Sequence, residues 1–199
     1  MFRRPLHVHI YKTAGTSIRT ALGIEDPPHL TAPELRAHVG KQEWAAGLPF
    51  AVVRNPWERF VSLYTYLYQR KQGDLGLQFQ ALNLLFDPWL RIMLIQEDDA
   101  IPTKVGDLTA FHWAWARPQS AWLGELVAPE NILRFERLDR QWPELLDRLG
   151  QSWRPLGKER VSTSRPECWE AYTWDLRRLV EQKCRVDIES FGYAFPEKP

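Results

Sequence analysis

The sequence predicts an α/β fold, a single domain over residues 1–199 with a central parallel sheet flanked by helices. Strand-like segments at 6–11 and 49–53 are each followed at once by the start of a helix. A third such segment, 131–135, precedes a helix at 139–149 that ends at a glycine. Strands that alternate with helices are typical of parallel sheets. A length of 199 residues fits one large domain, and a hydrophobic content of 44% suffices for a core.

The first junction, residues 7–22 (HVHIYKTAGTSIRTAL), is the stretch around which the chain is organised. Histidine and aliphatic residues alternate over 7–10, the period-two pattern of a strand. The chain then breaks at 12–15 and resumes as a helix from Thr16 or Ser17.

This break has the composition of an anion-binding loop. Amides at a helix start point outward and the helix dipole favours negative charge there. Lys12 adds a positive charge, Gly15 lets a ligand approach the backbone, and the Thr16–Ser17 pair adds hydroxyl donors. The nucleotide P-loop has an earlier glycine and places Lys after the last one, whereas Lys12 precedes Gly15. We therefore expect one compact phosphate or sulfate group here, and the alternative is an ordinary capped turn.

The second junction repeats this logic. The apolar run 49–53 predicts a buried central strand, with Asn55 as the cap of a helix that runs through Tyr68. The predicted core face of this helix is Trp57, Phe60, Val61, Tyr64 and Tyr68, and another face carries Arg59, Ser62 and Tyr66.

Arg54 stands at the carboxyl end of the second strand, as Lys12 follows the first. Ligands of open parallel sheets bind at that edge, so the two cations are expected to lie over one crevice, with Ser62 near them. The alternative is that Arg54 pairs with a carboxylate and Ser62 faces solvent.

Two further segments carry candidate residues. Thr31 and Glu34 form a capping box for a short helix, and His29 just before it is expected to be a solvent-exposed loop histidine. Ser164 opens another capping box, for one long helix. Arg165 at that helix start opposes the helix dipole, a conflict that a bound anion would remove.

Composition excludes several classes of protein. The net charge of +1 argues against a general nucleic-acid binder. Cys168 and Cys184 lie sixteen residues apart in the predicted long helix, about 24 Å at 1.5 Å per residue, too far for a disulfide. Free thiols, no metal-binding cluster, and no signal or transmembrane stretch predict a soluble cytoplasmic protein. The aromatic residues within 109–124 are interpreted mainly as core, with the wall of an acceptor pocket as the alternative.

These motifs together resemble the PAPS-dependent sulfotransferases (PAPS is 3′-phosphoadenosine 5′-phosphosulfate), in the carbohydrate, Golgi-like branch that includes bacterial members. Residues 11–17, YKTAGTS, match the phosphosulfate loop, and residues 54–64, RNPWERFVSLY, match the 3′-phosphate element. Residues 135–138 and 187–193 match later family segments, so the resemblance spans nearly the whole chain. Tyr11 replaces the usual proline of the loop, and of the family's Asn-x-Ser only the final serine is present, at position 164.

The resemblance implies a P-loop-NTPase-like sulfotransferase fold and a transfer from PAPS to an acceptor hydroxyl, on a carbohydrate. The residues that it implies for the phosphosulfate are Lys12, Thr13, Ala14, Gly15, Thr16 and Ser17. Arg54 and Ser62 are implied for the 3′-phosphate, with Ser164 and Arg165 closing over it. Lys12 and His29 are the implied catalytic residues, His29 as the base, for which His38 fits less well. No metal is required.

Two other classes of function stay open. One is a kinase or NTPase that uses the same crevice, against which the absent P-loop order counts. The other is a non-catalytic nucleotide-binding module, against which an intact Lys12 counts. The sequence does not name the acceptor, because the segments 71–110 and 150–162 carry no readable motif.

Overall fold

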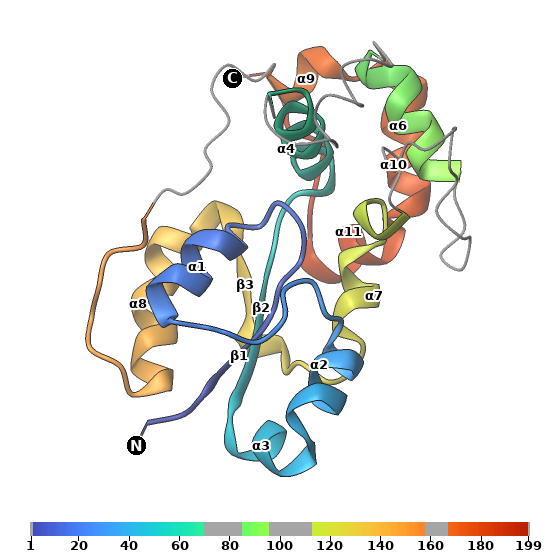
Figure 1. The fold of residues 1–199 in the computed structure, drawn as a ribbon. Helices are drawn as coiled ribbons and strands as arrows, with labels where there is room; N and C mark the ends of the chain where they lie inside the picture. Colours follow the sequence, from blue (N-terminus) through green and yellow to red (C-terminus); the bar gives the residue numbers. More distant parts are fainter. Residues whose placement is uncertain (1, 70–84, 96–112, 158–166, 199) are drawn as a thin grey trace. The chain divides into compact units, whose positions relative to one another are not determined.

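The computed structural model describes residues 2–69, 85–95, 113–157 and 167–198. They include both helices and strands, and the chain falls into two compact units (Figure 1). The first comprises Met1–Arg54 and Gln119–Val161, the second Asn55–Pro118 and Ser162–Pro199. The α/β class is confirmed, while a single domain over the whole chain stays a prediction.

A parallel three-stranded sheet forms the centre of the first unit. Its strands are β1 (Pro5–Val8), β2 (Leu48–Val53) and β3 (Ile132–Arg134), in the order β1-β2-β3. Register pairs His7 with Phe50 and Ala51 with Ile132. The predicted neighbourhood of the first two strands is confirmed, with β1 ending earlier than expected.

Helices cover both faces of this sheet (Figure 1). One face carries α1 (Gly15–Leu22) and α8 (Leu138–Leu149), and α2 (Ala32–Val39), α3 (Lys41–Ala46) and α7 (Gln119–Leu123) lie on the other. Short 3-10 turns, Pro129–Asn131 and Phe135–Arg137, flank β3. The core between the sheet and the first helix pair includes Ile18, Leu22, Phe50, Val52, Leu133, Trp142 and Leu146.

The cap signals of this unit are confirmed. The Thr31 hydroxyl accepts a hydrogen bond from the Glu34 amide, and the Glu34 carboxylate accepts one from the Thr31 amide at 2.7 Å, a reciprocal capping box. Gly150 ends α8 with φ 67°, a left-handed conformation that glycine adopts without steric cost. Local cap chemistry thus fixes where these helices begin or end.

His7 in β1 and His9 just after it are buried, as are the aliphatic residues with which they alternate. His7 is 3% exposed and His9 7% exposed. The reason is that a parallel sheet covered on both sides buries both sets of side chains. The ring of His7 stacks on Phe50, its partner across the register, with 4.8 Å between centroids and 8° between planes.

The described part of the second unit consists of helices. They are α4 (Pro56–Gln69), α6 (Phe86–Ile95), α9 (Cys168–Ala171), α10 (Trp174–Lys183) and α11 (Arg185–Phe191), with a 3-10 turn at Trp113–Trp115. Asn55 caps α4 as predicted, since its side-chain oxygen accepts from the Trp57 amide at 3.2 Å. Trp115 is buried, as the core interpretation expected. In the described ranges, we find no helix with both the length and the apolar character to cross a membrane.

The prediction for the faces of α4 was partly wrong. Tyr68, expected in the core, is 52% exposed, whereas Arg59 and Ser62 are buried. The reason is that α4 contacts α6, α9 and α10 and therefore buries more than one face. The Arg59 guanidinium donates to the carbonyls of Trp115 and Arg117 at 3.0 and 3.1 Å, which supplies partners for a buried charge.

The prediction of one long helix carrying both cysteines was also wrong. Cys168 is the first residue of α9, and Cys184 lies at the boundary of α10 and α11. The break comes before Thr173, whose hydroxyl caps α10 by accepting from the Leu176 amide. The separation derived from one straight helix therefore does not apply, although Cys168 and Cys184 are buried and form no disulfide in the described structure. Burial raises the pKa of the Cys184 thiol to about 12.

Burial of His7 predicts a specific pH dependence of stability. Desolvation, with a smaller contribution from the Arg19 charge, lowers the pKa of His7 from 6.5 to about 3. Neither ring nitrogen has a hydrogen-bond partner among the described residues. Between pH 6.5 and 3 the unfolded chain therefore binds a proton that the folded chain does not, and folded-state stability falls as the pH falls.

We expect His7→Phe, which keeps a flat ring on Phe50, to remove this dependence. When the pH is lowered from 7.5 to 5, the unfolding free energy of the wild type should fall by about 2 kcal/mol more than that of the variant. Urea unfolding at the two pH values measures the difference. Parallel pH dependence in the two proteins would contradict a neutral buried His7.

Candidate active site

The loop after β1 has an unusual backbone. Lys12 and Ala14 have φ of 67° and 64°, in the left-handed region, while Thr13 between them does not. The Thr13 hydroxyl donates to the Ile10 carbonyl at 2.9 Å and closes the turn. Left-handed residues beside right-handed ones are typical of backbone nests, whose amides bind anions, and Ala14 directly precedes the helical Gly15.

Helix α1 starts one residue earlier than predicted, at Gly15, with Ala14 in the N-cap position. Alanine offers no side-chain acceptor to the amides of the first turn, and no side-chain cap is formed. Thr16 is half-buried and Ser17 buried in this turn. The dipole and amides of the helix start are thus available to support a negative charge.

Gly15 is required for a close approach within the protein itself. A Cβ at this position would lie 1.9 Å from Cδ2 and Nε2 of His9. The imidazole of His9 therefore lies flush against the first residue of α1. The sequence analysis explained Gly15 by the approach of a ligand. No periodicity or motif in the sequence indicated its contact with His9.

Arg54 follows directly after β2 and reaches the first loop. Its Nη1 donates to the Lys12 carbonyl at 3.3 Å, and its guanidinium lies over the Phe135 ring, 4.2 Å from the centroid. Parallel pairing of β1 with β2 brings the two junctions to the same edge of the sheet. Lys12 and Arg54, predicted to share this edge, do so.

A residue that the sequence did not single out holds the end of β2. Gln119, fully buried at the start of α7, accepts from the Arg54 amide and donates to the Arg54 carbonyl, both at 2.8 Å. Its side-chain amide thus replaces a neighbouring strand and fixes the backbone of Arg54. One glutamine 65 residues away carries no sequence signal for this role.

His29 lies on the loop between α1 and α2 and is fixed in a left-handed conformation, with φ 62°. Its Nδ1 and the His9 carbonyl oxygen are 2.9 Å apart. Because a carbonyl only accepts, Nδ1 carries the proton, and in the neutral ring the lone pair is on Nε2. His29 is part-buried rather than the exposed loop residue that its local sequence indicated.

Aromatic contacts hold the imidazole plane of His29. Its ring stacks on Tyr11 at 3.7 Å and 7°, and lies 4.1 Å from the His9 ring at 30°. Tyr11 in turn meets Trp122 edge-on at 5.7 Å. Three aromatic side chains thus determine where this imidazole lies.

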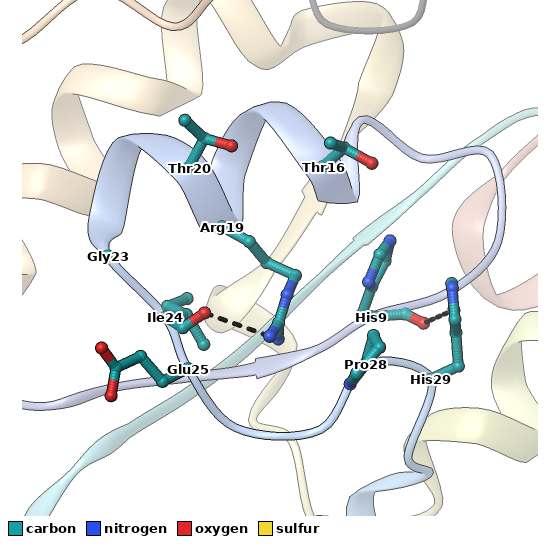
Figure 2. A pocket seen from close by; sticks show the side chains of 9 residues that line it. All are labelled: His9, Thr16, Arg19, Thr20, Gly23, Ile24, Glu25, Pro28 and His29. Carbon is teal, nitrogen blue, oxygen red and sulfur yellow. Dashed lines mark hydrogen bonds between the residues drawn. The ribbon is translucent and has the colours of Figure 1, made fainter.

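A pocket of about 510 Å³ opens beside this group, along one flank of α1 (Figure 2). It is lined by His9, Thr16, Arg19, Thr20, Gly23, Ile24, Glu25, Pro28 and His29. Arg19 shapes it by donating from Nη2 to the carbonyls of Ile24, at 3.1 Å, and Asp26. Its lining combines two imidazoles, two hydroxyls and side chains of both charges with the apolar Ile24 and Pro28.

The remaining predicted site residues lie in other elements or outside the described residues. Ser62 lies in α4 of the second unit, and Ser164, Arg165 and His112 lie outside the described residues. His38 lies in α2, where its Nε2 is 3.7 Å from the Asp26 carboxylate. Within the described ranges no group of three or more His, Cys, Asp or Glu side chains could hold a metal ion.

Comparisons of the chain with protein-family models, with curated proteins and with solved structures give no match.

Proposed function

We propose that the protein is a PAPS-dependent sulfotransferase of the P-loop-NTPase-like fold, which transfers a sulfuryl group to an acceptor hydroxyl on a carbohydrate. The observation that carries the proposal is the hydrogen bond from Arg54 to the Lys12 carbonyl, which joins two cation-bearing junctions at one sheet edge. PAPS carries anionic groups on the 3′ and 5′ positions of one ribose, so it needs two such anion sites close together. The left-handed loop and the uncapped first turn of α1 fit a compact phosphosulfate.

Each residue has a distinct role in this proposal. The donor supplies an activated sulfuryl group, and the acceptor oxygen forms a bond to sulfur as the bond to the 5′-phosphate oxygen breaks. Lys12 stabilises the charge on that leaving oxygen. Amides of Gly15, Thr16 and Ser17 hold the group in line with the acceptor. Arg54 binds the 3′-phosphate. The family resemblance assigns Ser62, Ser164 and Arg165 to the same phosphate.

His29 serves as the general base for the acceptor. Its hydrogen bond to the His9 carbonyl leaves the lone pair on Nε2, so that atom takes the acceptor proton. The pocket that includes His29 is where we place the acceptor, because its hydroxyl and charged side chains suit a hydroxyl-rich molecule.

The decisive test is sulfate transfer from radiolabelled PAPS to a panel of acceptors, together with calorimetry of PAP (the desulfated donor), PAPS and ATP. We expect transfer, and binding of PAP and PAPS but not of ATP. Lys12→Ala should lower turnover about a hundredfold or more, since its charge acts mainly in the transition state. Lys41→Ala, on the exposed side of α3, is the matched control. Tight ATP binding with phosphate transfer would favour a kinase, and nucleotide binding with no transfer to any acceptor a non-catalytic module.

The assignment of Arg54 is tested by comparing two nucleotides. Arg54→Ala should weaken PAP binding by about 1.5–3 kcal/mol, the scale of a charge-assisted hydrogen bond. Binding of adenosine 5′-phosphosulfate, which lacks the 3′-phosphate, should barely change. Arg140→Ala, exposed on α8, controls for the loss of one positive charge. Equal losses for the two nucleotides would show that Arg54 supports the fold rather than the 3′-phosphate.

The assignment of His29 is tested with two variants that differ in backbone preference. His29→Ala should lower turnover by about 10²–10⁴-fold while leaving PAP affinity nearly intact. His29→Asn, which tolerates the left-handed conformation, should lose as much, because it also lacks the imidazole. The acidic limb of the wild-type pH–rate profile should vanish in both. Should either variant keep most of its turnover, the base is another group, and His38→Ala provides the comparison.

A further inference from the structure

We propose that His9 is a positioning residue, which couples the anion loop to the catalytic base. The inference rests on the proposed function, in which Lys12 and the start of α1 hold the donor and His29 takes the acceptor proton. It assigns to His9 the task of fixing the distance between these two parts. His9 is 7% exposed and follows β1 immediately, so its position is determined by the sheet.

The first contact of His9 is with the helix start. The calculated distance of 1.9 Å between a Cβ at Gly15 and the His9 ring leaves no room for any side chain there. In Figure 2 the His9 ring points toward the first turn of α1 and stands beside His29. The first residue of α1 therefore packs against an imidazole.

The second contact of His9 is with His29, through two different groups. Its carbonyl accepts from Nδ1 of His29 and fixes which nitrogen carries the proton. Its ring lies 4.1 Å from the His29 ring and limits how far that ring can tilt. A displacement of His9 would therefore move Nε2 of His29 relative to the donor loop.

Both contacts lie at the pocket, since His9, Thr16 and His29 all line it. His9 meets Gly15 on one side and His29 on the other, so a change on either side is transmitted to the other. Each contact can be tested with its own set of variants.

The first set of variants tests the contact with His29. His9→Ala should lower kcat about tenfold to a hundredfold, as expected for a displaced catalytic group, with little change in the Kd of PAP. His9→Phe, which keeps a flat ring, should retain most of the turnover. In the His29→Ala background, His9→Ala should cause no further loss. A full additional loss there, or an unchanged kcat in His9→Ala, would overturn the proposal.

The second set tests the contact with Gly15. Gly15→Ala should lower the Tm and weaken PAP binding, because the new Cβ displaces either the His9 ring or the helix start. Adding His9→Ala removes the clash and should restore the Tm and PAP affinity, but not turnover. Gly47→Ala is the matched control, since its Cβ would lie 2.6 Å from Leu6 Cδ1. It should lower the Tm without any rescue by His9→Ala. Absence of rescue in the Gly15→Ala protein would overturn the proposal.

One further readout separates this inference from the proposed function. If no acceptor is sulfated, the proposed function fails, but the Tm rescue and the imidazole resonances of His29 can still be measured. We expect His9→Ala to shift the ring nitrogen resonances of His29 in NMR spectra, and His7→Phe to leave them nearly unchanged. Unshifted resonances in His9→Ala would overturn the coupling itself.

Discussion

The candidate site depends on the parallel pairing of β2 with strands on both of its sides. Since parallel strands end at the same edge, the loop after β1 and the residue after β2 emerge together, with Val8 in register with Ala51. Just beyond the end of β2, the side-chain amide of Gln119 bonds both backbone groups of Arg54. An antiparallel pairing of β1 with β2 would place Lys12 and Arg54 at opposite ends of the sheet, whatever the sequence of the loops.

Backbone strain is concentrated at this edge. Lys12, Ala14 and His29 are non-glycine residues in the left-handed region, and each costs on the order of 1 kcal/mol relative to ordinary conformations. The Thr13 hydroxyl bond and the His29–His9 bond, together with the stacked rings, stabilise these conformations. Glycines would adopt the same angles without cost. The side chains at Lys12 and His29 favour a functional explanation, because the proposed function needs an ammonium and an imidazole at these two positions.

Signals that act within a few residues could be predicted from the sequence. The three strands, the capping box at Thr31 and the glycine end of α8 follow from period and cap chemistry, and all were found. The break at Thr173 had the same kind of signal, a threonine cap, which the interpretation of one long helix overlooked. The contacts of His9 with Gly15, of Gln119 with Arg54 and of Arg19 with its loop had none, because they depend on which segments the fold brings together. Burial on two sides of α4 could not be predicted for the same reason.

Tyr11 also makes a long-range contact, with His29, at the position where the sulfotransferase loop that the sequence resembles usually has proline. A proline in that position would restrict the backbone entering the loop but would offer no flat ring. Tyr11 leaves the backbone less restricted and places a phenol ring 3.7 Å from the imidazole of His29, nearly parallel to it, with Trp122 against its edge. The loop entry is thus held by packing rather than by a fixed dihedral angle. Tyr11 therefore restrains two parts of the site together, the loop that holds Lys12 and the imidazole of His29, whereas a proline would restrain only the loop backbone.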